Sequence, residues 1–254
     1  MSKRRSTLRA AAFVWALATA LIMNTGCAET RVGGMSARDA FSDERVARLV
    51  TAGDNEDFKG MDTAIHDGAD VNAVGKDGIS PLMWLLTNRH LKSAERLLQA
   101  GANPNYKEPK DNYSAIAVAA GGSYPEMLEL LLKYGGDPNA RGLEHNDPLL
   151  IIAVMHFRDA NIDLLLKYGA DINIHRADGD TAANVAVGLG RFDLAAKFLE
   201  RGLTHNLLNL AKDAEISQVR PNSEAQRWKD KVIEMLKERG IKFPAFKPRR
   251  SEDD

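Results

Sequence analysis

The residues that could carry out chemistry by themselves are few and scattered along the chain. The 254 residues include one cysteine, Cys27, and six histidines, and no two histidines have the four-residue helical spacing of a metal site. There is no glycine-rich phosphate loop, and the serines lack the surroundings of a hydrolase nucleophile. We therefore predict no catalytic residue, no metal site and no cofactor, so the protein is not expected to be an enzyme.

Cys27 is the one reactive side chain with an informative sequence context. The first nine residues include the basic side chains Lys3, Arg4, Arg5 and Arg9 and no acidic one. Residues 10–23 form an uncharged apolar run that is short for a membrane span but suits a signal peptide. Thr25-Gly26-Cys27 then resembles the lipobox of bacterial lipoproteins, although Asn24 stands where that family usually has leucine.

This resemblance implies that residues 1–26 are removed and that Cys27 carries lipid. Three acyl chains exceed the two signals that stable membrane anchoring requires. Ala28 and Glu29 follow Cys27, with no aspartate at the second position. By the same resemblance, this favours the outer membrane of a Gram-negative bacterium, with the protein facing the periplasm. Two other interpretations remain open: a secreted protein with a free cysteine, or an anchored, uncleaved helix.

A five-residue pattern that begins with glycine recurs after leucine-rich helical runs. Its leading glycines are 33, 34, 34 and 33 residues apart, and the copies are residues 68–72, 101–105, 135–139, 169–173 and 202–206. A fixed period of this size is typical of stacked repeats. The glycine suits the left-handed position after a helix, and the Asp or Asn two residues later can hold a turn.

The repeat resembles the ankyrin repeat family. Gly68-Ala69-Asp70-Val71-Asn72-Ala73 matches the family's closing motif, and Ser80-Pro81-Leu82-Met83 matches its opening motif with two changes. The resemblance covers about residues 42–206 and implies an all-α ankyrin-repeat solenoid, following the signal peptide. We expect Trp84 to lie in its core.

The opening motif is degraded, and its histidine is lost from every repeat. The four histidine positions are expected to hold Met83, Ala117, Leu150 and Asn184. Because repeat stability depends on interfaces between neighbours, this loss predicts weaker coupling. The fourth repeat has one extra residue, which we expect in the turn around residues 156–161.

The pattern divides the chain into four segments. We predict a signal peptide over residues 1–26, a flexible tether over 27–39, an ankyrin array with a divergent C-terminal cap over 40–242, and a disordered tail over 243–254. The most secure helices are expected at 80–88 and 93–99, and the cap helix at 224–239, with Trp228 in its core.

Charge favours a protein partner over nucleic acid. The formal net charge is −1, and the exposed loops mix basic and acidic residues, so no basic stripe is expected. We expect a monomer that binds a protein partner and contacts the membrane only through its lipid.

The ankyrin resemblance also implies where a partner binds, because loop tips and first helices of that family face the binding groove. Aromatic and Arg side chains are enriched among binding hot spots. The candidate residues are Ile79, Tyr106, Lys107, Tyr113, His145, Asn146, His175 and Arg176. For Tyr106 and Tyr113, packing on the neighbouring loop is an equally good interpretation.

The layout, with a helix that contains Trp228 near the end of the array, resembles ankyrin lipoproteins that serve as immunity proteins against type VI secretion phospholipase effectors. This implies an inhibitor that binds a lipase-type toxin in the periplasm. The alternative is a structural or helper lipoprotein that supports a periplasmic enzyme. A hydrolase on an unusual scaffold is the least favoured interpretation.

Overall fold

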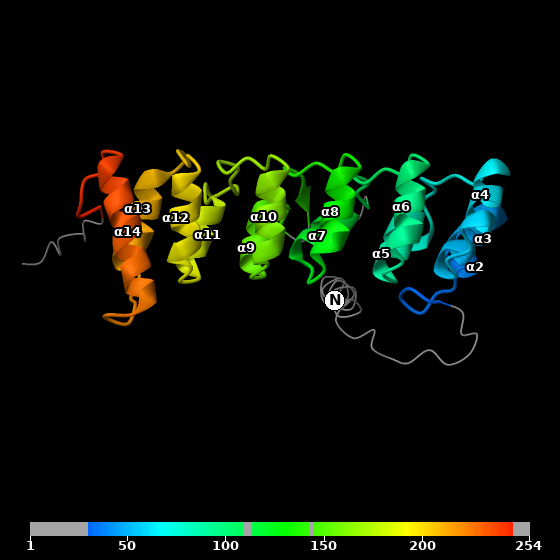
Figure 1. Cartoon of the computed structure of the whole chain (residues 1–254), viewed down its shortest axis with the longest axis horizontal. Coiled ribbons are helices and arrows are strands. Elements are labelled where there is room, and N and C mark those ends of the chain that lie inside the picture. The colour runs from blue at the N-terminus through cyan, green and yellow to red at the C-terminus, as the bar shows by residue number, and fades with distance from the viewer. Residues whose placement is uncertain (1–29, 109–112, 143–144, 246–254) are drawn as a thin grey trace, which may run out of the picture. The chain divides into compact units, whose positions relative to one another are not determined.

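A computed structural model describes residues 30–108, 113–142 and 145–245 (Figure 1). The predicted signal peptide, Cys27 and residues 246–254 of the predicted tail lie outside the described residues. The chain divides into two compact units, residues 1–146 (unit 1) and 147–254 (unit 2). Both units are built mainly of short helices, which confirms the predicted all-α repeat fold.

In unit 1, each repeat contributes a first helix and an antiparallel second helix. The elements are α2 (Ala37–Ala40), α3 (Glu44–Asp54), α4 (Phe58–His66), the 3-10 turn η1 (Lys76–Gly78), α5 (Pro81–Thr87), α6 (Leu91–Gln99), α7 (Ala115–Gly121), α8 (Pro125–Lys133) and the strand β1 (Arg141–Gly142). The first helices α3, α5 and α7 pack in sequence.

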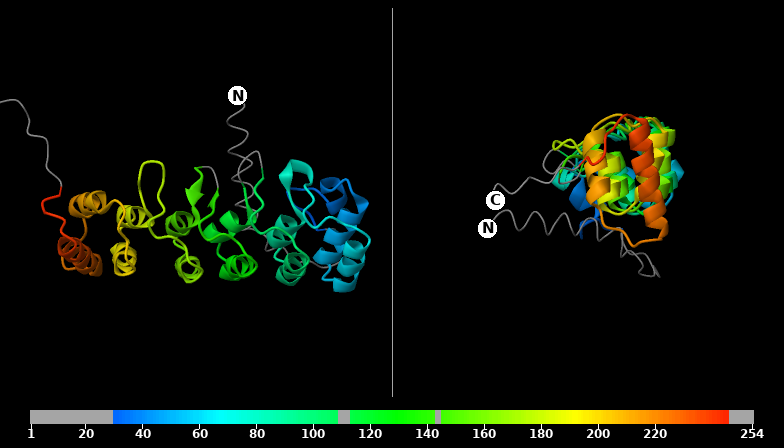
Figure 2. Two further views of the ribbon diagram at one scale, coloured as in Figure 1. Left: turned by 90° about the horizontal axis from the view of Figure 1, so that it is seen from above. Right: turned by 90° about the vertical axis from the view of Figure 1, so that its left-hand side faces the viewer.

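Unit 2 continues the same alternation. Its elements are the strand β2 (Asp147–Pro148), α9 (Leu149–Met155), α10 (Asp159–Lys167), α11 (Ala182–Gly188), α12 (Phe192–Glu200), α13 (Leu207–Ile216) and α14 (Glu224–Glu238). Within each unit, the first helices form one layer and the second helices another (Figure 2). Helix α14 packs on α12 and α13 and ends the unit, at the position predicted for the cap helix.

Four consecutive repeats have identical helix lengths. The first helices α5, α7, α9 and α11 have seven residues each, and the second helices α6, α8, α10 and α12 have nine. The predicted insertion at residues 156–161 is therefore wrong, because the extra residue precedes α9. Pro148 is the N-cap of α9, which moves the histidine position of this repeat from Leu150 to Ile151.

The glycine turns have the predicted geometry. Gly68, Gly101, Gly135 and Gly169 have φ between 87° and 92°, in the left-handed region that glycine enters without steric cost. The residue two positions after each glycine is Asp or Asn. Its side-chain oxygen accepts a hydrogen bond from the backbone N–H of the asparagine that ends the motif, at 2.8–2.9 Å in all four copies.

In unit 1, the asparagines that end two closing motifs join their own turn to the next one. Asn72 donates to the Gly101 carbonyl (3.0 Å) and accepts from the Asn103 N–H (2.7 Å). Asn105 repeats both bonds with Gly135 (2.9 Å) and Asp137 (2.8 Å). This asparagine ladder connects neighbouring repeats by side-chain bonds to backbone groups that would otherwise need water.

Trp84 lies in the core as predicted and is fully buried. Its indole Nε1 donates to both carboxylate oxygens of Asp54, at 3.1 and 2.9 Å. In the cap, Val232 and Leu236 supply the buried stripe of α14, whereas Trp228 is only half-buried, with Lys231 Nζ 4.9 Å from its ring centre.

The segment predicted as a flexible tether is folded from about Arg31 onward. Val32 is 3% exposed, Ser36 and Asp39 form a reciprocal capping box, and the short α2 packs on α3. The expectation of a free tether through residue 39 is therefore wrong for this part. The apolar residues Val32, Ala37 and Ala40 mark it as a cap for the first repeat.

No helix within the described ranges is long and apolar enough to cross a membrane.

Candidate functional site

The predicted partner-binding residues lie on the loops that lead into the first helices. We call the described parts of these segments the hairpin loops: residues 74–79, 106–108 with 113, and 141–142 with 145–146 in unit 1, and residues 174–180 in unit 2. Backbone bridges between Lys107 and Ser114 and between His175 and Thr181 close two of them. The asparagine ladder fixes the turns at the base of these loops.

Tyr106 contributes a hydrogen bond between two neighbouring hairpin loops. Its hydroxyl donates to the carbonyl oxygen of Gly78, on the preceding hairpin loop, at 3.1 Å. Burial, with a smaller effect from the Glu108 carboxylate, raises the pKa of the Tyr106 hydroxyl. Glu108 is itself buried, and a Cβ at Gly78 would collide with its side chain. The two loops are therefore closely packed, which is the second of the two interpretations proposed for Tyr106.

Ile79 packs inside the fold, although the sequence predicted it as a partner-binding residue. Its side chain is only 4% exposed and lies directly before the N-cap of α5. The assumption that residues at this position are free for recognition is wrong for Ile79, because an isoleucine beside the apolar start of α5 loses its contact with water on folding.

The other candidates of unit 1 differ in exposure. Lys107, His145 and Asn146 are exposed, and Tyr113 is half-buried, its carbonyl accepting a hydrogen bond from the Glu108 N–H at 2.7 Å. Asn146 has a φ of 53°, in the left-handed region that asparagine tolerates better than most residues. Lys107, His145 and Asn146 are thus available to a partner, and their role in binding stays a prediction.

In unit 2, Arg176 is held in a defined position. Its guanidinium binds both oxygens of Asp147 (2.8 and 2.7 Å) and contacts the Met155 sulfur at 2.6 Å. The Asp147 side chain is 7% exposed and that of Arg176 24%. The hydrogen bond with Asp147 raises the pKa of Arg176. Such a bidentate, partly buried pair fixes the guanidinium plane at the loop surface.

His175 lies against His205, from the next repeat, with ring centres 4.1 Å apart. His205, Asp147 and Met155 lie beside the predicted site residues and were not predicted from the sequence. The contact with His205 could have been predicted from the repeat alignment, because His205 lies in the degraded fifth closing motif, one repeat after the loop that carries His175.

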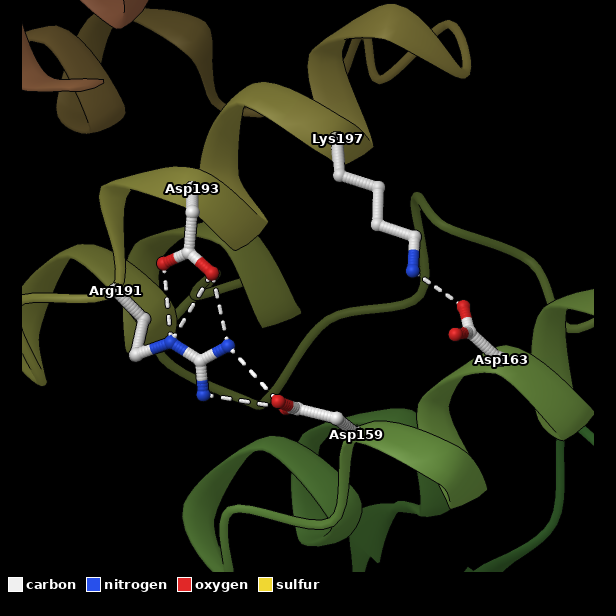
Figure 3. Close-up of polar contacts among 5 residues, drawn as sticks. All are labelled: Asp159, Asp163, Arg191, Asp193 and Lys197. Atoms are coloured by element: carbon white, nitrogen blue, oxygen red, sulfur yellow. Dashed lines mark hydrogen bonds and ion pairs between the residues drawn. The ribbon is translucent and has the colours of Figure 1, made fainter.

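The second helices carry ion pairs that link successive repeats. In unit 2, Lys197 of α12 pairs with Asp163 of α10, and Arg191 binds Asp159 at 3.1 Å and Asp193 at 2.8 Å (Figure 3). The bond with Asp193 raises the pKa of Arg191 and lowers that of Asp193. Repeat stacking explains the pairs of Lys197 with Asp163 and of Arg191 with Asp159, which join neighbouring repeats.

Among the described residues, no group of three or more His, Cys, Asp or Glu is placed to hold a metal ion. In the same part of the chain, every buried side-chain nitrogen or oxygen has a hydrogen-bond partner. The predicted lipidation site, Cys27, lies outside it.

The family model of ankyrin repeats (3 copies) matches residues 49–142. Comparison with curated proteins gives no match. The matched stretch runs from the end of α3 to β1, and the helix lengths show that the same repeat continues through α12.

Proposed function

As an ankyrin-repeat protein the chain is a protein-binding module, and we propose that it is tethered to the bacterial envelope, where it binds and inhibits a toxic effector such as a periplasmic phospholipase. The hairpin loops would supply the contacts, with Lys107, His145 and Asn146 as exposed polar groups and with His175 and Arg176 as half-buried ones.

The observation that carries this proposal is the set of hydrogen bonds and ion pairs that hold described residues of the hairpin loops and of the turns at their base. The asparagine ladder, the bond from Tyr106 to Gly78 and the pair of Arg176 with Asp147 hold loop residues in fixed positions before any partner arrives. Ordering loops on binding costs free energy for each immobilised side chain, so loops that are already ordered support tighter binding. A fixed guanidinium also favours recognition of a defined acceptor over non-specific attraction.

The experiment uses the full-length protein in its membrane. The protein is solubilised with detergent and isolated, and the proteins that accompany it are identified. We expect a phospholipase among these proteins. Its hydrolysis of phosphatidylethanolamine vesicles should fall to near zero when about one chain per enzyme molecule is added, because a tight complex forms at equal concentrations of the two partners. A preparation that yields no stable protein complex would contradict the proposal.

The envelope tether is tested separately through Cys27. We expect Cys27→Ala to abolish incorporation of labelled palmitate and to release the protein from membranes, because the cysteine sulfur is the attachment point. Labelling that persists in the variant would contradict lipidation. A parent protein found in the soluble fraction would do the same.

The second candidate function is a helper or structural lipoprotein that supports a periplasmic enzyme. It shares the rigid loops and the expected anchor, and differs only in the effect on the partner. Partner activity that rises when the chain is added would favour this alternative, whereas stoichiometric inhibition favours the immunity role.

A further inference from the structure

The fold begins close to Cys27, the predicted lipid attachment point. Val32 is 3% exposed, and its backbone exchanges two hydrogen bonds with that of Met35, at 3.1 and 3.0 Å. Only residues 28–30 separate Cys27 from Arg31, where this folded segment starts. An extended chain spans at most about 3.6 Å per residue, so the Cα atom of Arg31 cannot lie more than about 14 Å from that of Cys27.

The start of the fold is packed against the first hairpin loop, residues 74–79. Helix α2 contacts the 3-10 turn η1 of that loop as well as α3. A Cβ at Gly75 would lie 2.6 Å from the Ala40 carbonyl oxygen and 2.9 Å from the Phe41 ring, so the two segments leave no space between them. Phe41 is 3% exposed, and its ring centre lies 6.1 Å from that of Trp84. The short connection to the lipid therefore restrains this hairpin loop as well.

We call residues 31–44 and 74–79 the N-terminal edge of unit 1. Val74 is an exposed apolar side chain there, at 59%. The exposed charged side chains of the edge are Arg31, Arg38, Lys76, Asp39, Glu44 and Asp77. An anionic membrane surface attracts basic clusters with about 1 kcal/mol for each Lys or Arg, and three basic against three acidic groups leave no net attraction or repulsion. Charge therefore neither holds the edge at a bilayer nor keeps it away, and its position follows from the anchor.

We propose that the N-terminal edge lies on the membrane surface, at the polar headgroups of the phospholipids. The acyl chains on Cys27 would enter the hydrocarbon, and each polar layer of a bilayer is about 5–8 Å thick. After crossing that layer, a connection of about 14 Å has about 6–9 Å left, which is less than the width of one helix, about 10–12 Å. No segment of a partner protein fits between the edge and the lipid.

A partner that binds the hairpin loop 74–79 therefore meets it at the lipid surface. This inference rests on the lipid anchor of the proposed function and makes its partner more specific. The partner is a protein that acts on the bilayer itself, and the array binds it where it reaches its substrate.

The first test measures how close the edge lies to lipid headgroups. Lipidated protein is purified from membranes and reconstituted into vesicles of phosphatidylethanolamine and phosphatidylglycerol. Acylation blocks the sulfur of Cys27, so the variants Arg38→Cys, Val74→Cys and His145→Cys each offer one free thiol for a fluorophore. His145, an exposed residue two hairpin loops further along unit 1, is the control position. We expect lipids with a nitroxide headgroup to quench the labels at 38 and 74 at least about twofold more than the label at 145, because two packed repeats add about 16–20 Å.

The outcomes separate the inference from the anchor on which it rests. Equal quenching at the three positions, or stronger quenching at position 145, would overturn the inference while the anchor stands. A parent protein that does not attach to the vesicles would contradict the anchor and the inference together.

The second test lengthens the connection between the lipid and the fold. About twelve glycine and serine residues inserted between Glu29 and Thr30 add a flexible linker with a root-mean-square length of about 17–21 Å. Palmitate labelling should be unchanged, whereas quenching of the label in Val74→Cys should fall at least about twofold, because only the short connection holds the edge at the lipid. The same residues added after Asp254 are the control and should leave quenching unchanged. Undiminished quenching after the insertion before Thr30 would overturn the inference, because affinity for lipid would then hold the edge.

Discussion

Tyr106 illustrates how a single loop residue can serve the fold and a surface together. An aromatic ring in a long, polar loop suggests recognition, but its hydroxyl donates to Gly78 of the neighbouring loop. The sequence could not separate the two roles, because the acceptor is a backbone carbonyl 28 residues away whose position depends on repeat stacking. The same holds for Arg176, whose partner Asp147 is 29 residues away.

We expect Tyr106→Phe to lower the free energy of unfolding by about 0.5–1.5 kcal/mol, since it removes one hydrogen bond and leaves the ring in place. Chemical denaturation measures the change. Lys107→Ala, on the same loop but exposed, is the control and should change stability by less than about 0.5 kcal/mol. Equal stability of Tyr106→Phe and the parent would show that the bond contributes nothing.

Asp54 is a second residue whose role the sequence concealed. Its carboxylate side chain is 6% exposed, receives the Trp84 indole N–H, and lies 3.6 Å from His90 Nε2. Burial raises the pKa of this carboxyl more than these partners lower it. The folded protein therefore binds a proton at Asp54 more tightly than the unfolded chain does, and this group lowers stability as the pH rises from about 4 through the folded pKa.

Asp54→Asn removes this titration and keeps one oxygen to accept from Trp84. We expect the variant to gain stability relative to the parent as the pH rises from about 4 to about 7, measured by urea denaturation at each pH. If the parent instead gains on the variant over this range, the hydrogen bonds from Trp84 outweigh burial and the folded pKa is lowered.

At the scale of elements, most helices could be predicted from the sequence, but the alignment of the opening motif with helix α9 in the fourth repeat could not. Helices were expected at 80–88, 93–99 and 224–239, and the structure has Pro81–Thr87, Leu91–Gln99 and Glu224–Glu238. The fourth repeat was misaligned because proline is common at the first helical position, as Pro81 shows, whereas Pro148 occupies the N-cap. The exposure of Met155 and Phe157 was invisible for the same reason, since it depends on where α9 ends.

The asparagine ladder joins neighbouring repeats by hydrogen bonds. Weaker coupling between repeats was predicted because the histidines of the opening motif are lost. We predict that Asn105→Ala lowers the free energy of unfolding by about 1–2 kcal/mol, because it breaks the bonds to Gly135 and Asp137. Asn55→Ala, which loses only a bond to Thr51 within its own helix, is the control and should cost less. Similar losses in both variants would mean that the ladder adds nothing to coupling between repeats.

At the scale of the whole molecule, the repeats form two compact units, each with its own buried stripe. A stack in which each repeat contacts mainly its neighbours has a stability that is the sum of local terms. The loss of the opening-motif histidines predicted weaker coupling between neighbouring repeats. The position at which the chain divides could not be predicted, because the first helices α5 to α11 and the second helices α6 to α12 keep the same lengths on both sides of residue 146.

Leu131 and Leu165 test this organisation as a matched pair. Each is fully buried, and each is the seventh residue of a nine-residue second helix, α8 in unit 1 and α10 in unit 2. Either substitution by alanine should cost about 2–5 kcal/mol of local stability through the cavity it creates. With local stability, Leu131→Ala should accelerate amide hydrogen exchange mainly in unit 1, and Leu165→Ala mainly in unit 2, as measured by mass spectrometry. Acceleration of both units to the same extent by either variant would show that the chain opens as one cooperative block, which the additive behaviour of a repeat stack does not allow.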